Sequence, residues 1–95
     1  MNPRITGQVH IIGSGLLGTS IGLALTNLGV DVSLEDSSPA VLSLAKDFGA
    51  GRSLDAEDNV SIVIVCVPPD VPAETISSAI QRFPEAVVTD VASVK

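Results

Sequence analysis

A glycine-rich loop constrains this chain more than any other feature. Gly13-Ser14-Gly15-Leu16-Leu17-Gly18 follows an apolar run at 9–12 and leads into a stretch with helical periodicity. A strand, a G-x-G-x-x-G loop and a helix in this order form a turn whose backbone holds a pyrophosphate, because the first helical N–H groups lack internal partners. Gly13 permits the turn, Gly15 lets phosphates approach the main chain, and Gly18 lets the helix pack on the strand. The alternative is a plain tight turn between strand and helix.

Asp36 lies at the end of the next expected strand, eighteen residues beyond Gly18. A carboxylate at this place accepts hydrogen bonds from the ribose hydroxyls of an adenosine group. It also repels a 2′-phosphate, and no basic residue follows in Ser37-Ser38-Pro39 to neutralise one. The spacing therefore predicts NAD as the cofactor, with NADP less favoured. The alternative is a solvated carboxylate at a strand end.

Strands and helices alternate along the chain. We expect strands at 8–12, 30–34, 52–53, 62–67 and 86–90, with helices at 17–28, 39–48 and 70–83. This alternation indicates parallel pairing with right-handed crossovers. The predicted fold class is α/β, a Rossmann-type doubly wound parallel sheet with strand order 3-2-1-4-5. Nothing after the fifth strand completes such a fold, so we expect residues 1–95 to be the amino-terminal part of a longer protein.

The helices are expected to bury one apolar stripe each. The positions predicted to face the core are Leu17, Ile21, Ala24, Leu25 and Leu28 in the first helix, with Gly18 and Gly22 also available for close packing, Val41, Leu44, Ala45 and Phe48 in the second, and Ile76, Ala79, Ile80 and Phe83 in the third.

Charge and composition exclude several classes of partner. The formal net charge of −6 argues against nucleic acid and against an anionic membrane surface. The single cysteine, Cys66, excludes an internal disulfide and fits a reducing, cytoplasmic compartment. No apolar run approaches ~18 residues, and no basic-then-apolar leader opens the chain, so we expect neither membrane insertion nor secretion. The acidic residues Asp55, Glu57 and Asp58 lack the spacing of a calcium loop, which predicts a solvated turn and no metal site.

Three further residues are candidates for chemistry. His10 is the only imidazole, but it lies near the start of its strand, whereas ligands gather at the carboxyl ends of parallel strands. We therefore expect a structural role for His10, and a core position for Cys66, which has no cation or base beside it in sequence. Asp90 ends the last expected strand and Ser93 follows it, at the edge where a nicotinamide is expected. The Ser93 hydroxyl either contacts a substrate or catalytic partner or caps a following helix.

Three segments together resemble the prephenate and arogenate dehydrogenases of tyrosine biosynthesis. They are HIIGSGLLGTSIGLAL, which contains the glycine loop, VCVPPD at 65–70 and VTDVASVK at 88–95. The third is the most specific, and Ala92 departs from it, because the family usually carries glycine there. The resemblance covers the whole chain.

The resemblance implies a dinucleotide domain followed by a helical domain that forms a homodimer and completes the substrate site. It implies oxidative decarboxylation of prephenate to 4-hydroxyphenylpyruvate, or the matching reaction of arogenate. Ser93 would bind the catalytic histidine, which belongs beyond Lys95 together with the substrate-binding arginines, so the isolated chain is expected to be inactive. The residues predicted to bind the cofactor are Gly13, Ser14, Gly15, Leu16, Leu17, Gly18, Asp36, Ser37, Val67, Pro68 and Asp90. The alternatives are another NAD-dependent hydroxy-acid or imino-acid dehydrogenase and a non-catalytic NAD-sensing module.

Overall fold

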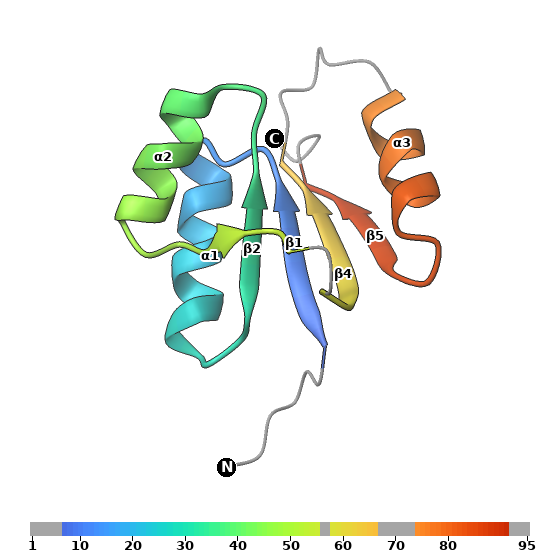
Figure 1. Ribbon diagram of the computed structural model, residues 1–95, viewed down its shortest axis with the longest axis horizontal. Coiled ribbons are helices and arrows are strands. Elements are labelled where there is room, and N and C mark those ends of the chain that lie inside the picture. The colour runs from blue at the N-terminus through green and yellow to red at the C-terminus, as the bar shows by residue number, and fades with distance from the viewer. Residues whose placement is uncertain (1–6, 56–57, 67–73, 92–95) are drawn as a thin grey trace.

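The strands form one parallel sheet with the predicted order. The computed structural model describes residues 7–55, 58–66 and 74–91. Within these residues the sheet has five strands in the order β3-β2-β1-β4-β5. The strands are β1 (Gln8–Ile12), β2 (Val32–Glu35), β3 (Arg52–Ser53), β4 (Val60–Val65) and β5 (Val87–Asp90). Every pairing is parallel, and the carboxyl ends of β1, β2 and β4 point to one edge, where α1 begins (Figure 1). The predicted Rossmann-type α/β fold is confirmed.

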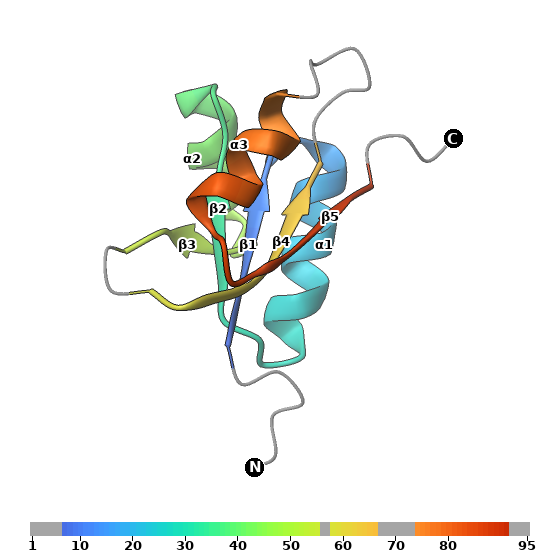
Figure 2. The same ribbon diagram turned by 90° about the vertical axis from the view of Figure 1, so that its right-hand side faces the viewer.

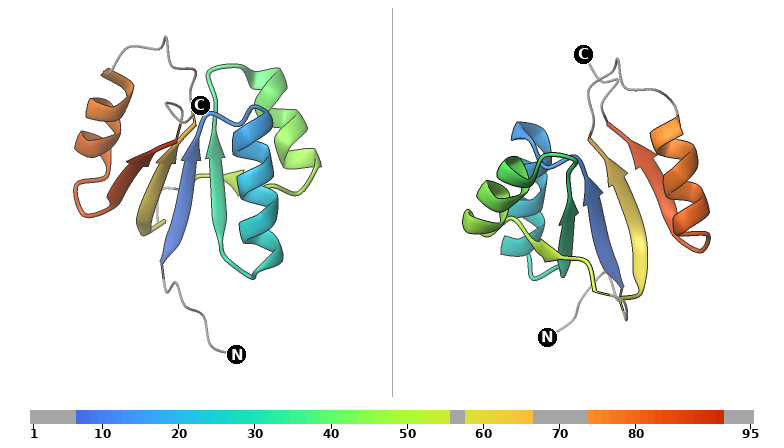
Figure 3. Two further views of the ribbon diagram at one scale, coloured as in Figure 1. Left: turned by 180° about the vertical axis from the view of Figure 1, so that it is seen from behind. Right: turned by 45° about the horizontal axis from the view of Figure 1, so that its top comes forward.

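Helices cover both faces of this sheet. The helices are α1 (Leu16–Asn27), α2 (Pro39–Asp47) and α3 (Glu74–Arg82). Apolar side chains of α1 and α2 pack on the Val9, Ile11 and Leu34 side of the sheet. Ala79 of α3 packs on the opposite side, against Val63. Figure 2 shows α1 and α3 on opposite sides of β1 and β4, and Figure 3 shows α1 running along the sheet from behind. No helix among the described residues is long and apolar enough to cross a bilayer.

The helices bury stripes that match the predicted ones only in part. In α1 the two glycines expected to allow close packing, Gly18 and Gly22, are buried, whereas Leu17 and Leu28 are exposed. A Cβ at Gly22 would clash with the carbonyl oxygen of Ala50. The backbone of α1 therefore packs on its neighbours through its glycines rather than through its leucines. The other predicted core positions that are exposed are Ala24, Val41, Leu44, Phe48 and Ile80. The remaining predicted positions pack against the core, joined by Leu23 and Leu42.

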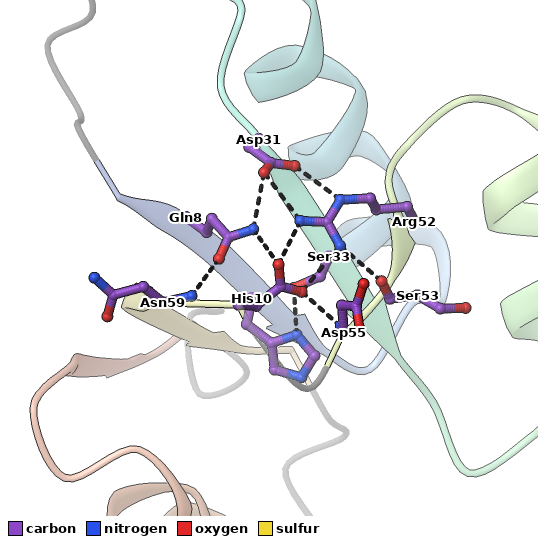
Figure 4. Close-up of polar contacts among 9 residues, drawn as sticks. Gln8, His10, Asp31, Ser33, Arg52, Ser53, Asp55 and Asn59 are labelled. Atoms are coloured by element: carbon purple, nitrogen blue, oxygen red, sulfur yellow. Dashed lines mark hydrogen bonds and ion pairs between the residues drawn. The ribbon is translucent and has the colours of Figure 1, made fainter.

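A polar network links Arg52 of β3 to other residues at the amino edge of the sheet. Arg52 donates to Asp31 at 2.9–3.0 Å, and Gln8 also donates to Asp31 (Figure 4). Both side chains donate to Asp58 as well, Arg52 at 2.9 Å. Arg52 lowers the pKa of Asp58. The prediction of a solvated acidic turn is wrong for Asp58, because its side chain is only 10% exposed. The described part of the β3–β4 connection contains no helix.

Candidate dinucleotide-binding site

The glycine loop has the geometry that its three glycines predict. Gly13 has φ 94°, a left-handed conformation that favours glycine, and its N–H donates to the carbonyl oxygen of Glu35 at 2.7 Å. A Cβ on Gly18 would clash with the carbonyl oxygen of Gly13, so α1 packs against the end of β1 only because Gly18 has none. A Cβ on Gly15 would meet no atom within 4 Å. The loop therefore leaves open space where the backbone faces outward, at the carboxyl edge of the sheet.

The first turn of α1 offers unpaired backbone donors beside that space. Gly15 is the N-cap, no side chain caps the helix, and no acidic residue lies in its first turn. The N–H groups of Leu16 and Leu17 belong to this turn, where helices lack internal acceptors. The side chains of both leucines are exposed, and Leu16 is 90% exposed. This helix end is therefore suited to a phosphate, since its backbone dipoles carry partial positive charge.

Asp36 lies beside the glycine loop and is bonded to it. Its Oδ2 accepts a hydrogen bond from the Ser14 N–H at 2.7 Å, and its Oδ1 accepts one from the Ser38 N–H at 2.8 Å. Ser14 is buried, and the Thr19 hydroxyl donates to its carbonyl oxygen at 2.7 Å. A carboxylate oxygen can accept two hydrogen bonds, so Asp36 retains capacity for ribose hydroxyls. The spacing argument placed Asp36 at this edge, but it missed the contacts of Asp36 and Thr19 with the loop.

Two other predicted residues lie at the same edge. Ser37 is exposed directly after Asp36. Asp90 ends β5 in register with Val65, and the neighbouring Cys66 is half-buried at the end of β4. Burial, and to a smaller extent the negative charge of Asp90, raise the pKa of the Cys66 thiol. The thiol is therefore un-ionised and a poor nucleophile at neutral pH. Val67, Pro68 and Ser93 lie outside the described residues.

His10 is buried in the middle of β1, on the face that α3 covers. Its Nδ1 lies 2.7 Å from the Ser33 hydroxyl and its Nε2 lies 2.9 Å from Glu35 Oε1. Because an ionised carboxylate only accepts, Nε2 carries a proton. Serine, histidine and glutamate in contact resemble a hydrolytic triad, but Ser33 and His10 are both fully buried and no substrate reaches them. The geometry agrees with the structural role expected for His10.

Glu35, the residue before Asp36, has its own set of partners. Arg82 of α3 binds its carboxylate with two hydrogen bonds of 2.8 and 2.9 Å. The hydrogen bond from His10, and next that from Arg82, lower the pKa of Glu35 from 4.5 to about 2. Among the described residues no group of three or more His, Cys, Asp and Glu side chains is arranged to hold a metal ion.

Residues 8–94 match the family described as "NADP oxidoreductase coenzyme F420-dependent". The chain belongs to this family. It is also 45% identical over 85 residues, 90% of its length, to a protein of Streptomyces niveus named "Probable prephenate dehydrogenase NovF". The chain spans 24% of the length of that relative.

These comparisons confirm the resemblance stated from the three sequence segments. The chain is a dinucleotide-binding domain of an oxidoreductase, and its cofactor is a nicotinamide dinucleotide. The open backbone at Gly15, the uncapped start of α1 and the Asp36 carboxylate suit the pyrophosphate and ribose of such a cofactor.

Proposed function

We propose that this chain is the cofactor-binding portion of a prephenate dehydrogenase that uses NAD. Residues 13–18 hold the pyrophosphate through backbone N–H groups, and Asp36 with Ser37 holds the adenosine ribose. The observation that carries this proposal is the open space over Gly15 beside the Asp36 carboxylate, at one edge of the sheet. Likeness to the Streptomyces niveus protein supports the substrate class.

In the whole enzyme, a hydride leaves prephenate as the ring carboxylate departs as CO2, which gives 4-hydroxyphenylpyruvate. The dinucleotide supplies the hydride acceptor when bound. The residues of this chain bind and orient it, with Val67, Pro68 and Asp90 along the cofactor cleft. Ser93 positions the catalytic histidine. That histidine belongs to another part of the protein, because His10 is the only histidine of this chain and is buried. We further propose that the whole enzyme is a cytoplasmic homodimer of tyrosine biosynthesis, joined through its downstream region.

The isolated chain is expected to bind NAD without oxidising prephenate or arogenate. The groups that hold the adenosine half lie within the chain, whereas its one histidine cannot reach a substrate. Calorimetry with NAD and a spectrophotometric assay of NADH formation measure the two properties separately. Adding the downstream region, as a fusion or a separate chain, is expected to produce turnover. NADH formation by the chain alone, in proportion to its concentration, would refute the proposed division of roles. Binding of NAD by a whole protein that turns over neither substrate would instead favour a non-catalytic NAD-sensing module.

Cofactor choice is expected to depend on Asp36. We expect the chain to bind NAD more tightly than NADP, because the carboxylate repels a 2′-phosphate. The double substitution Asp36→Ser and Ser37→Arg should lower the ratio of NAD affinity to NADP affinity by about tenfold or more. The reason is that a hydrogen bond to a charged group contributes about 1.5–3 kcal/mol. Calorimetry with both dinucleotides measures the ratio, and Ser37→Arg alone separates the added charge from the lost carboxylate. Equal affinities in the unaltered chain would contradict the role assigned to Asp36.

A further inference from the structure

Three side chains from three elements meet at the carboxyl end of β2. Glu35 ends β2, His10 comes from β1, and Arg82 is the last residue of α3. The Glu35 carboxylate accepts from His10 Nε2 at 2.9 Å and from two nitrogens of Arg82 at 2.8 and 2.9 Å. The Arg82 guanidinium also lies 5.1 Å from the centre of the Phe83 ring. We call His10, Glu35 and Arg82 the Glu35 tether.

The glycine loop is held by the main chain of Glu35 and by the side chain of Asp36. The carbonyl oxygen of Glu35 accepts the Gly13 N–H at 2.7 Å, and the Asp36 carboxylate accepts the Ser14 N–H at 2.7 Å. Glu35 at the end of β2 and Asp36 directly after it thus bind two consecutive residues of the loop. Any movement of Glu35 along or across the sheet would lengthen these bonds and shift the backbone that faces the open space at Gly15.

We propose that the Glu35 tether is a positioning device for the phosphate-binding loop. Arg82 and His10 fix the Glu35 side chain from the face opposite α1, and Glu35 with Asp36 then fixes Gly13 and Ser14 at the ligand edge. The tether thereby couples the end of α3 to the dinucleotide site. The expected effect of the tether on ligand affinity rests on the proposed function. The expected effect on the conformation of the loop does not.

The state of charge of the tether supports this role. Hydrogen bonds from His10 and then Arg82 lower the pKa of Glu35 to about 2, so the carboxylate is ionised at neutral pH. The ion pair is partly exposed, since the side chains of Arg82 and Glu35 are 43% and 36% accessible. Pairs of this kind contribute little to overall stability because water screens them. Loss of the pair is therefore expected to alter the local geometry of the loop more than the free energy of unfolding.

Arg52 provides a matched control at the opposite edge of the sheet. Its side chain is 41% accessible, close to the value for Arg82, and it also pairs with carboxylates, those of Asp31 and Asp58. Within the part of the chain that the structure describes, Arg52 binds Asp31, Asp58 and the Ser53 carbonyl, none of which belongs to the glycine loop. A general effect of losing a surface guanidinium would appear in both variants, whereas positioning of the loop would appear only in the Arg82 variant.

The test compares Arg82→Gln with Arg52→Gln in the 95-residue chain, using two measurements. The first is the amide resonances of Gly13 and Ser14 in NMR spectra without ligand, which report the two loop hydrogen bonds. The second is calorimetric affinity for ADP-ribose, which contains the adenosine and pyrophosphate groups. We expect Arg82→Gln to shift both resonances and to weaken ADP-ribose binding by about three- to tenfold, the size typical of coupling through a packed network. Arg52→Gln should change neither, and Arg82→Lys, which keeps the charge, should recover part of the affinity.

Different failures have different meanings. Unchanged Gly13 and Ser14 resonances in Arg82→Gln would overturn the inference, and so would equal changes in Arg82→Gln and Arg52→Gln. If Arg82→Gln unfolds the chain, Arg82→Lys decides by the same two measurements, and resonances and affinity equal to those of the unaltered chain would overturn the inference. If the unaltered chain binds no ADP-ribose, the proposed function fails, while the NMR comparison still decides the role of the tether.

Discussion

Gly15→Val is expected to abolish dinucleotide binding and to leave the chain folded. The side chain would enter the open space over the loop, where, apart from Ser14 and Leu16, no described residue has an atom within 4 Å of a Cβ, so it meets the ligand and not the core. Gly15 has φ −70°, which valine tolerates. Excluding the pyrophosphate from the backbone loses two or more charge-assisted hydrogen bonds of about 1.5–3 kcal/mol each, hence at least about a hundredfold in affinity. Calorimetry with NAD measures this loss, and circular dichroism measures the fold.

Ala24→Val is the matched control for that experiment. Ala24 lies on the exposed side of the same helix, so the control adds a β-branched residue to α1 away from the loop. It should leave NAD affinity unchanged. Affinity of Gly15→Val equal to that of the unaltered chain would contradict the proposed pyrophosphate site. Binding lost only together with the circular dichroism signal would show instead that Gly15 is needed for folding.

Gly18→Ala is expected to destabilise the fold strongly, although it adds only one methyl group. The new Cβ would overlap the carbonyl oxygen of Gly13 and lie 3.3 Å from Cγ2 of Ile11. Both neighbours belong to the buried end of β1 and its loop, so relief requires α1 to move off the sheet. Overpacking of this kind costs about 1–3 kcal/mol and occasionally more, which is a large part of the stability of a small domain. Urea denaturation measures the change in the free energy of unfolding.

The same substitution at Gly15 is the control for Gly18→Ala. Gly15→Ala adds the same methyl group three residues earlier, into open space. Its free energy of unfolding should stay within about 0.5 kcal/mol of the unaltered chain, as for surface substitutions in general. Equal stability of Gly18→Ala and Gly15→Ala would contradict close packing of α1 on β1.

Elements with strong local signals were predicted from sequence with correct type and nearly correct bounds. The β1 strand has the expected limits, and α2 begins at Pro39 after Ser38, whose hydroxyl accepts the Val41 N–H at 3.4 Å. The short β3 strand lies where Arg52 and Ser53 were assigned. These signals are local: apolar runs, caps and glycines describe the backbone of the segment that contains them. The fold class followed because alternating strands and helices leave few topologies.

The face that each helix buries was predicted less well. Counting apolar residues selected the leucine stripe of α1, yet Leu17 and Leu28 are exposed and Gly18 and Gly22 are buried. Periodicity gives the spacing of a face but not the distance at which two backbones pack. Here the distance is short enough to require glycine. At Gly18 the requirement comes from Gly13 of the same loop, whereas at Gly22 it comes from Ala50, which is remote in sequence.

Some features of the candidate site were likewise predicted from the sequence, and others were seen only in the structure. The glycine loop and the position of Asp36 at the end of β2 followed from the sequence alone, because the strand–loop–helix order and the spacing place both at one sheet edge. Only the tertiary structure showed that Asp36 binds the Ser14 N–H, and that Glu35 joins His10 to Arg82 across 25 and 47 residues. Local backbone preference determines which elements form and where the loop lies. Contacts between distant side chains exist only after the sheet assembles, and therefore only the assembled fold decided how this loop is held.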